Sequence, residues 1–110
     1  MFADTVSSAY VDRTLPAGRV QGARGLVEAQ RRFREAFPNG RVHVLQQIIA
    51  GDRVASHLRV TGRFIGSRDG VRGLGQRIDY LATDIMRISS GRIVENWHVE
   101  DHVTLNSQLG

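Results

Sequence analysis

The sequence predicts an α+β fold in which a helix packs on one face of a curved antiparallel sheet. Apolar residues recur at helical spacing in one segment near the N-terminus, and they alternate with polar residues in the longer segments after it. A helix followed by strands that short turns connect is typical of an antiparallel meander. Because 110 residues support one domain, we expect residues 1–110 to form a single unit.

The predicted helix begins near Gly22 and ends at the turn-forming segment Pro38-Asn39-Gly40. Its apolar residues are three or four positions apart and form one stripe: Leu26, Ala29, Phe33 and Phe37. Residues 1–21 indicate only a turn of helix and a loop, because their short apolar patch is followed by Pro16 and Gly18.

Four long strands are predicted after the helix. Turns at residues 51–52 and 89–91 separate them, together with a loop that contains four glycines between Gly66 and Gly75. The strands are residues 41–50, 53–66, 76–88 and 92–103. The loop sequence "GVRGLG" lacks the strand–loop–helix context of a phosphate or dinucleotide site, so we expect a flexible connection there.

The composition excludes several classes of function. The chain has no cysteine, which removes disulfides, cysteine nucleophiles and thiolate metal sites. All 15 basic residues are arginines and the net charge is +4, but only Arg31, Arg32 and Arg34 form a cluster, so biased codon usage is favoured over a nucleic-acid surface. No segment has the pattern of a membrane span or an export signal. We therefore expect a cytoplasmic protein without nucleic-acid or membrane partners.

Asp84 is the only charge in an alternating row of the third predicted strand. The other members of that row are Ile78, Tyr80, Ala82, Met86 and Ile88. A carboxylate in an apolar row is either paired with a cation or raised in pKa, which suits general acid–base chemistry. The alternative is a structural aspartate that accepts hydrogen bonds from the backbone or from an arginine.

The last predicted strand divides into two faces. The more apolar set contains Trp97 and Asp101, which we expect to face inward, and the other set contains His98 and His102. Because residues three apart on a strand point to opposite faces, and His98 and His102 lie too far apart, no metal site is predicted.

The segment "DIMRISSGRIVENWHVEDHVTLNSQLG" resembles the C-terminal signature of SnoaL-like proteins, which belong to the nuclear transport factor 2-like superfamily. Upstream, "AYVDRTLPAGRVQGARGLVEAQRRFREAFPNGRVHV" fits the loop, the Gly-x-x-Gly-Leu helix start and the Ala-Phe-Pro helix end of that family. The resemblance covers nearly the whole chain. Its C-terminal part falls on Asp84, Arg87, Gly91–Glu95, Trp97, His98, Asp101 and Leu105–Gly110.

This resemblance implies a cone-shaped α+β barrel: a bent antiparallel sheet around helices, with a pocket in the mouth and a homodimer formed through the sheet. Members of the family include polyketide ring cyclases with an acid–base Asp and a His, epoxide hydrolases, ketosteroid isomerase-like enzymes and binding proteins. The fold therefore does not define the reaction.

Several positions depart from the family pattern. The N-terminal helix is expected to be shortened, which leaves the cone more open or covered by a dimer partner. The loop pair Asp-His is here Asp12-Arg13, and the His of Gly-Thr-His-x-Gly is missing from residues 62–66. His57, Arg59 and Val99 replace the Arg, Asp and Asp of the epoxide hydrolases, so epoxide hydrolysis is not expected.

We therefore expect a pocket for a hydrophobic small molecule and, if the protein is catalytic, proton transfer on an apolar carbonyl or polycyclic substrate without a cofactor. Asp84 or Asp101 would be the base, and His57 or His98 would donate to the enolate oxygen. Four further side chains are predicted to contact the substrate: Trp97, Tyr80, Arg59 and Met86. Taken alone, His57 and Arg59 are typical of a solvated face. The alternative function is a non-catalytic ligand-binding or dimerisation module.

Overall fold

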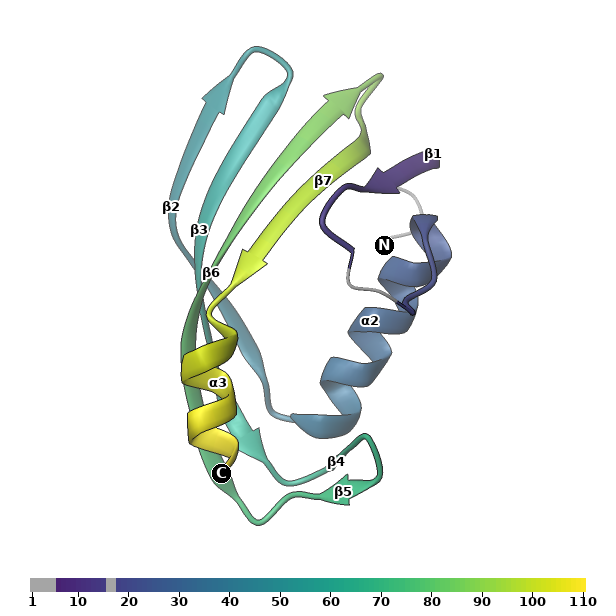
Figure 1. Cartoon of the computed structure of the whole chain (residues 1–110). Helices are drawn as coiled ribbons and strands as arrows, with labels where there is room; N and C mark the ends of the chain where they lie inside the picture. Colours follow the sequence, from purple (N-terminus) through teal and green to yellow (C-terminus); the bar gives the residue numbers. More distant parts are fainter. Residues whose placement is uncertain (1–5, 16–17) are drawn as a thin grey trace.

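The computed structural model describes residues 6–15 and 18–110. Within them, one sheet of five strands in the order β1-β7-β6-β3-β2 curves around one side of the molecule, and two helices lie on its inner face (Figure 1). A two-stranded ribbon, β4-β5, lies at one end. The elements are β1 (Val6–Asp12), α2 (Gly22–Ala36), β2 (Arg41–Ala50), β3 (Arg53–Phe64), β4 (Ser67–Arg68), β5 (Val71–Arg72), β6 (Gln76–Ser89), β7 (Arg92–Glu100) and α3 (His102–Leu109). The predicted α+β class with a curved antiparallel sheet is confirmed.

The inner face of the sheet holds the hydrophobic core. Alternate residues of β3 and β6 are buried there, with Ile78 fully enclosed. The end of α2 closes the core, since Ala36 and Phe37 are buried and the ring of Phe37 packs on Phe64 at 5.8 Å between centroids. This burial supplies the main driving force for folding.

The prediction of a loop before the helix is wrong for residues 6–12. They form β1, which pairs in parallel with β7 and buries Val6 and Tyr10. The apolar alternation is incomplete because β1 is an edge strand whose register shifts between Val6 and Val11. The predictions for residues 1–5, including the shortened N-terminal helix, and for 16–17 lie outside the described residues.

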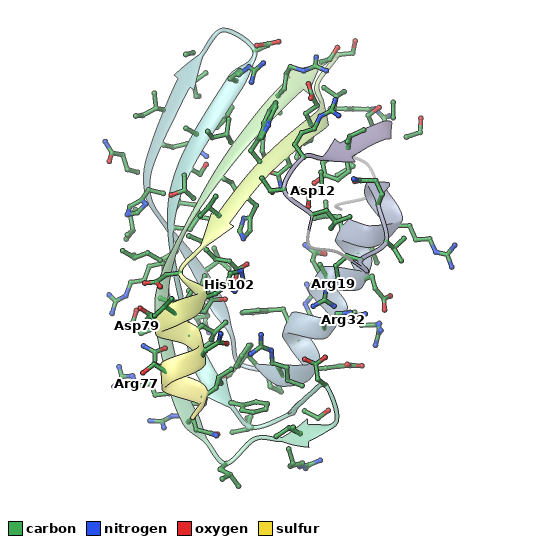
Figure 2. The ribbon with its side chains drawn as sticks, in the orientation of Figure 1. Asp12, Arg19, Arg32, Arg77, Asp79 and His102 are labelled. Carbon is green, nitrogen blue, oxygen red and sulfur yellow. The ribbon has the colours of Figure 1, made fainter. Side chains whose placement is uncertain are left out.

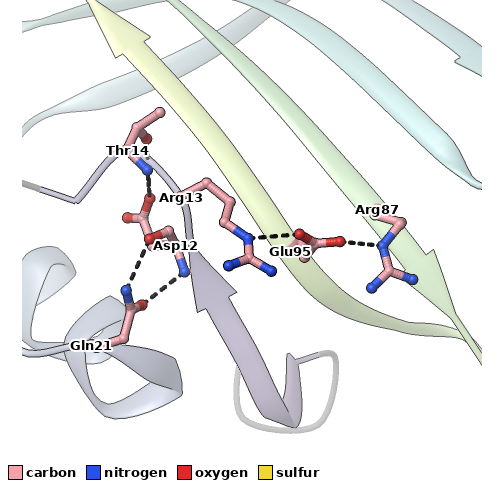
Figure 3. Close-up of polar contacts among 6 residues, drawn as sticks. All are labelled: Asp12, Arg13, Thr14, Gln21, Arg87 and Glu95. Atoms are coloured by element: carbon pink, nitrogen blue, oxygen red, sulfur yellow. Dashed lines mark hydrogen bonds and ion pairs between the residues drawn. The ribbon is translucent and has the colours of Figure 1, made fainter.

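The predicted helix is confirmed as α2, and Gln21 ties its start to β1. The Gln21 side chain accepts from the Gly22 N–H, and its amide exchanges two hydrogen bonds with the backbone of Asp12, at 2.7 and 2.9 Å. Figure 3 shows this pairing. A side-chain amide thus continues the backbone hydrogen bonding of β1 at its exposed end.

The prediction that the last strand reaches Val103 is wrong, because β7 ends at Glu100 and α3 follows. Asp101 is the N-cap of α3: its side chain accepts from the Thr104 N–H at 3.0 Å and from the Thr104 hydroxyl at 2.6 Å. The pairing of β7 stops opposite Ala82, so α3 covers the remaining edge of β6. There Gln108 exchanges two hydrogen bonds of 2.8 Å with the backbone of Asp79, which lies beside α3 (Figure 2).

The predicted glycine loop contains the ribbon β4-β5, and its first glycine is required by packing. A Cβ at Gly66 would lie 1.6 Å from the carbonyl oxygen of Glu35, and the Gly66 N–H donates to the Ala36 carbonyl at 3.1 Å. Only glycine allows this approach of the loop to the end of α2. None of the helices in the described ranges is long and apolar enough to cross a membrane.

Replacing Gln108 by alanine is expected to lower the free energy of unfolding by about 1 kcal/mol, because the backbone of Asp79 loses two hydrogen bonds at a sheet edge. Urea denaturation followed by circular dichroism measures this loss. Asn106→Ala is the matched control, since Asn106 is an exposed residue of the same helix. Equal stabilities of the two variants would contradict a stabilising role of the Gln108 amide.

Candidate active site

Three ionisable side chains meet on the inner face of the sheet, where β6 and β7 lie side by side (Figure 1). Asp84 of β6 lies directly opposite His98 of β7, and Glu100 lies two positions further along β7. The His98 Nδ1 contacts Asp84 Oδ1, and the His98 Nε2 lies 2.7 Å from Glu100 Oε1. Because each ring nitrogen faces a carboxylate, the imidazole can donate on both sides only as an imidazolium.

The electrostatics of this triad favour a permanent charge on His98. The Asp84 carboxylate, followed by that of Glu100, raises the pKa of His98 to about 10 against the opposing effect of burial. The same contact with His98 lowers the pKa of the Glu100 carboxyl group. With one imidazolium between two carboxylates, the triad has a formal excess of one negative charge at neutral pH.

The predicted orientation of the last strand is wrong. Asn96 is buried on the inner face with 6% exposure, and His98 shares that face with Asp84. Trp97 points to the outer face, where it lies opposite the exposed Ile85 of β6. The Cζ of Arg53 lies 4.9 Å from the centroid of the Trp97 ring. Apolar content misled the assignment, because His98 finds charged partners on the inner face in Asp84 of β6 and Glu100 of its own strand.

Two tyrosines and an amide lie on the same face as the triad. Tyr80 is 6% exposed, and burial followed by the nearby Glu100 carboxylate raises the pKa of its hydroxyl. Tyr10 of β1 is 4% exposed; burial raises the pKa of its hydroxyl, and the neighbouring Asn96 amide partly offsets the rise. Within the described ranges, neither the Tyr10 hydroxyl nor Asn96 Oδ1 has a hydrogen-bond partner.

The structure separates the predicted site residues into three groups. The inner face holds four of them: Asp84, His98, Tyr80 and the half-buried Met86.

The outer face holds three of them: His57, Arg59 and Trp97. There the Nδ1 of His57 lies 3.4 Å from the Thr83 hydroxyl, and Arg59 forms an ion pair with Asp79. Asp101 lies on neither face, because it caps α3. Their predicted roles toward a substrate stay predictions.

Sequence reasoning missed Glu100, Tyr10 and Asn96. The signal for Glu100 is present, since it lies two positions from His98 and so shares its face of the strand. Tyr10 lacks such a signal, because its place beside Asn96 depends on the parallel pairing of β1 with β7, whose strands are far apart in the chain.

The structure has two cavities near α2, and Asp84, His98 and Glu100 line neither of them. One of about 390 Å³ runs along α2 and is lined by Val27, Gln30, Arg31, Arg34 and Glu35. The other, of about 40 Å³, lies between β1 and α2 and includes Tyr10, Leu15, Val20 and Leu26. In the part of the chain that the structure describes, no three His, Cys, Asp or Glu residues are grouped to hold a metal ion. The predicted pocket around Asp84 and the predicted homodimer stay predictions.

A comparison with known protein families identifies the family of this chain. The sequence model of the SnoaL-like polyketide cyclase family matches residues 1–109. The chain belongs to this family. The predicted resemblance is thereby confirmed, and the α+β fold with its curved sheet is that of a SnoaL-like domain. A comparison with curated proteins gave no match.

Solved structures show the same SnoaL-like fold. A proposed polyketide cyclase from Bacillus cereus ATCC 10987 is 38% identical over 99% of this chain and 67% of that chain, with a TM-score of 0.86. IdmH, a proposed polyketide cyclase from Streptomyces antibioticus, is 24% identical over 99% of this chain and 84% of that chain, with a TM-score of 0.84. A LEH-like epoxide hydrolase from M. tuberculosis is 15% identical over 96% of this chain and 72% of that chain, with a TM-score of 0.67. The last two similarities show the fold alone.

The imidazole of His98 is expected to stay protonated across neutral pH and to titrate near pH 10. Its contribution to folding stability is complete below pH 6.5, the ordinary pKa of histidine, and is lost as the pH rises through about 10. Imidazole ¹⁵N chemical shifts measured against pH check the midpoint. In Asp84→Asn the midpoint should move toward 6.5, because Asp84 is the larger cause of the shift. A midpoint near 6.5 in the parent protein would show that the triad does not form.

Proposed function

We propose that this SnoaL-like protein transfers protons on an apolar carbonyl or polycyclic substrate, as in aldol-type ring closure or isomerisation. Asp84 is the base. Its carboxylate takes a proton from a carbon next to a carbonyl group, and the electron pair of that C–H bond moves into an enolate. The enolate carbon then either attacks a second carbonyl carbon or takes the proton back from Asp84 at another position. In the first case a C–C bond forms as the C=O π bond opens, and the resulting alkoxide oxygen takes the proton from Asp84, which restores the carboxylate.

The observation that carries this proposal is the state of Asp84. Its side chain is 14% exposed, and Oδ1 is held by His98. No hydrogen bond reaches Oδ2 from the described residues, so this oxygen has a free lone pair. An oriented carboxylate with one unused oxygen on an inner face has the geometry that a general base needs.

His98 acts in this proposal as a positioning residue. Both of its N–H groups are directed at carboxylates, so it has no donor left for an enolate oxygen. Its charge instead keeps Asp84 and Glu100 together on one face, although two carboxylates repel each other. The role of donor is open to the Tyr10 hydroxyl and the Asn96 amide, which lie on that face.

The surroundings of Asp84 favour an apolar substrate. On the inner face, Met86 and Ala82 flank Asp84 on β6, and Leu58 and Val54 lie on the neighbouring β3. On the outermost strand, Val44 is 59% and Ile49 71% exposed, and their cross-strand partners Leu58 and Val54 place them on the same face. Apolar surface of this kind is a favourable contact for a hydrophobic ligand.

Family membership also supports the proposal, since the family is described as polyketide cyclase-like and the 38% identical B. cereus protein is proposed to be one. The competing function is a binding module of the same fold without a reaction. The free Asp84 Oδ2 favours the enzyme, because a module that only binds an apolar ligand has no need of an oriented carboxylate.

Replacing Asp84 by asparagine is expected to lower kcat about 10²–10⁴-fold while the substrate still binds. A thermal-shift screen of hydrophobic carbonyl compounds would first identify ligands of the parent protein, and turnover of each hit would then be followed by mass spectrometry. Asp69→Asn is the matched control, because Asp69 is an exposed aspartate in the turn between β4 and β5 with a positive φ that asparagine tolerates.

Two results would contradict the proposal. If Asp84→Asn converts the ligand as fast as the parent, Asp84 is not the base. If the parent binds hydrophobic carbonyl compounds tightly but converts none of them, the binding module is the better description.

A further inference from the structure

A second polar cluster lies on the outer face of the sheet, away from the triad. Glu95 of β7 is only 14% exposed and lies between two arginines, Arg13 after β1 and Arg87 on β6. Glu95 Oε2 accepts from Arg13 Nε at 2.7 Å, and Glu95 Oε1 accepts from Arg87 Nε (Figure 3). One carboxylate thus holds two guanidinium groups side by side, and these arginines lower the pKa of Glu95.

Among the described residues, both guanidinium groups make their hydrogen bonds through Nε. Each guanidinium carries five N–H donors, so four remain on the two Nη nitrogens of each residue. In Figure 3 the Nη nitrogens of Arg13 and Arg87 point to the same side of the Glu95 carboxylate. The two side chains are 51% and 33% exposed, so solvent reaches these donors. The Nη groups of the two arginines are therefore two oriented sets of hydrogen-bond donors that face the same solvent-exposed side.

A third arginine, Arg53, adds positive charge beside Arg13 and Arg87. Arg53 of β3 lies directly opposite Arg87, and its guanidinium covers the ring of Trp97 at 4.9 Å. Like charges directly opposite on neighbouring strands are destabilising. The three arginines exceed the charge of Glu95 by two, and Asp52 offsets this only weakly, since its Oδ1 is 4.0 Å from Arg53 Nε.

We propose that Arg13, Arg87 and Arg53 form a binding site for a phosphate-type oxyanion. Glu95 orients the first two guanidinium groups, and the anion accepts from their Nη donors and from Arg53. Bridging by an anion also relieves the repulsion between Arg53 and Arg87. The site lies on the opposite face of the sheet from Asp84, so it is independent of the proposed reaction.

A phosphate monoester fits the site formed by Arg13, Arg87 and Arg53 better than a carboxylate does. A carboxylate offers two oxygens and one negative charge, whereas a phosphate monoester offers three terminal oxygens and close to two negative charges at neutral pH. The Nη donors of Arg13 and Arg87, together with the charge of Arg53, match the larger number of acceptor oxygens on a phosphate monoester. Trp97 beside Arg53 gives the site an apolar flank, so a phosphate that carries an apolar group is the expected ligand.

Trp97 also reports on binding, because it is the only tryptophan of the chain. We expect inorganic phosphate and phenyl phosphate to change its fluorescence saturably at constant ionic strength, as Arg53 moves toward the anion. Benzoate should bind at least about fivefold more weakly, because it offers one oxygen acceptor fewer for charge-assisted hydrogen bonds. Phenyl phosphate tighter than inorganic phosphate identifies a phosphate carrying an apolar group, and equal binding identifies the free anion.

Substitutions then test the individual residues in the full-length chain, with circular dichroism to confirm folding. Arg13→Gln and Arg87→Gln should each weaken phosphate binding at least about fivefold. Arg77→Gln, at an exposed arginine of the same strand β6, removes the same charge and should leave phosphate binding within about twofold.

Three outcomes would overturn the site. These are a fluorescence change that chloride reproduces at the same ionic strength, equal losses in Arg77→Gln and Arg87→Gln, or tighter binding of benzoate than of phosphate. If Arg87→Gln fails to fold, Arg13→Gln decides alone, since Arg13 lies after β1 and is half-exposed. Turnover of a carbonyl substrate plays no part in these measurements, so failure of the site and failure of the proposed reaction remain distinguishable.

Discussion

The antiparallel register of β6 and β7 is the constraint on which both polar clusters depend. It places Asp84 opposite His98 on the inner face and Arg87 opposite Glu95 on the outer face. A shift by one residue would exchange the faces of every side chain on one strand and break both pairs. The ionic contacts in turn favour this register over its neighbours, because a carboxylate left without its cation on a partly buried face is costly.

The ends of this sheet are completed by side chains rather than by further strands. The amide of Gln21 continues the hydrogen bonding of β1 at Asp12, and the amide of Gln108 does the same for β6 at Asp79. Each glutamine supplies one donor and one acceptor, which is what an edge residue lacks. The two helices are thereby tied to the sheet at the places where strand pairing stops.

Burial of an imidazolium between two carboxylates changes what the histidine can do. A histidine with a free nitrogen can exchange a proton near neutral pH, but His98 has both nitrogens engaged and a pKa raised to about 10. In the proposed reaction its charge is therefore a fixed part of the site, and the proton is taken by the unused oxygen of Asp84. In that proposal the neutral hydrogen-bonding groups of Tyr10 and Asn96 are the partners for the developing enolate.

Periodicity alone determined the α+β class, the helix from Gly22, the four long strands and the inward row of Asp84, since the spacing of apolar residues records which side of each element is buried. Tertiary structure decided the rest. The face of β7 could not be inferred from apolar content, because the strand buries Asn96 and His98 against polar partners from β1 and β6. Likewise, α3 replaced the predicted end of that strand because Asp101 can cap a helix that covers the edge of β6. Pairing across long chain separations leaves no local pattern, and this is why the places of Tyr10 and Arg13 beside β7 became visible only in the folded chain.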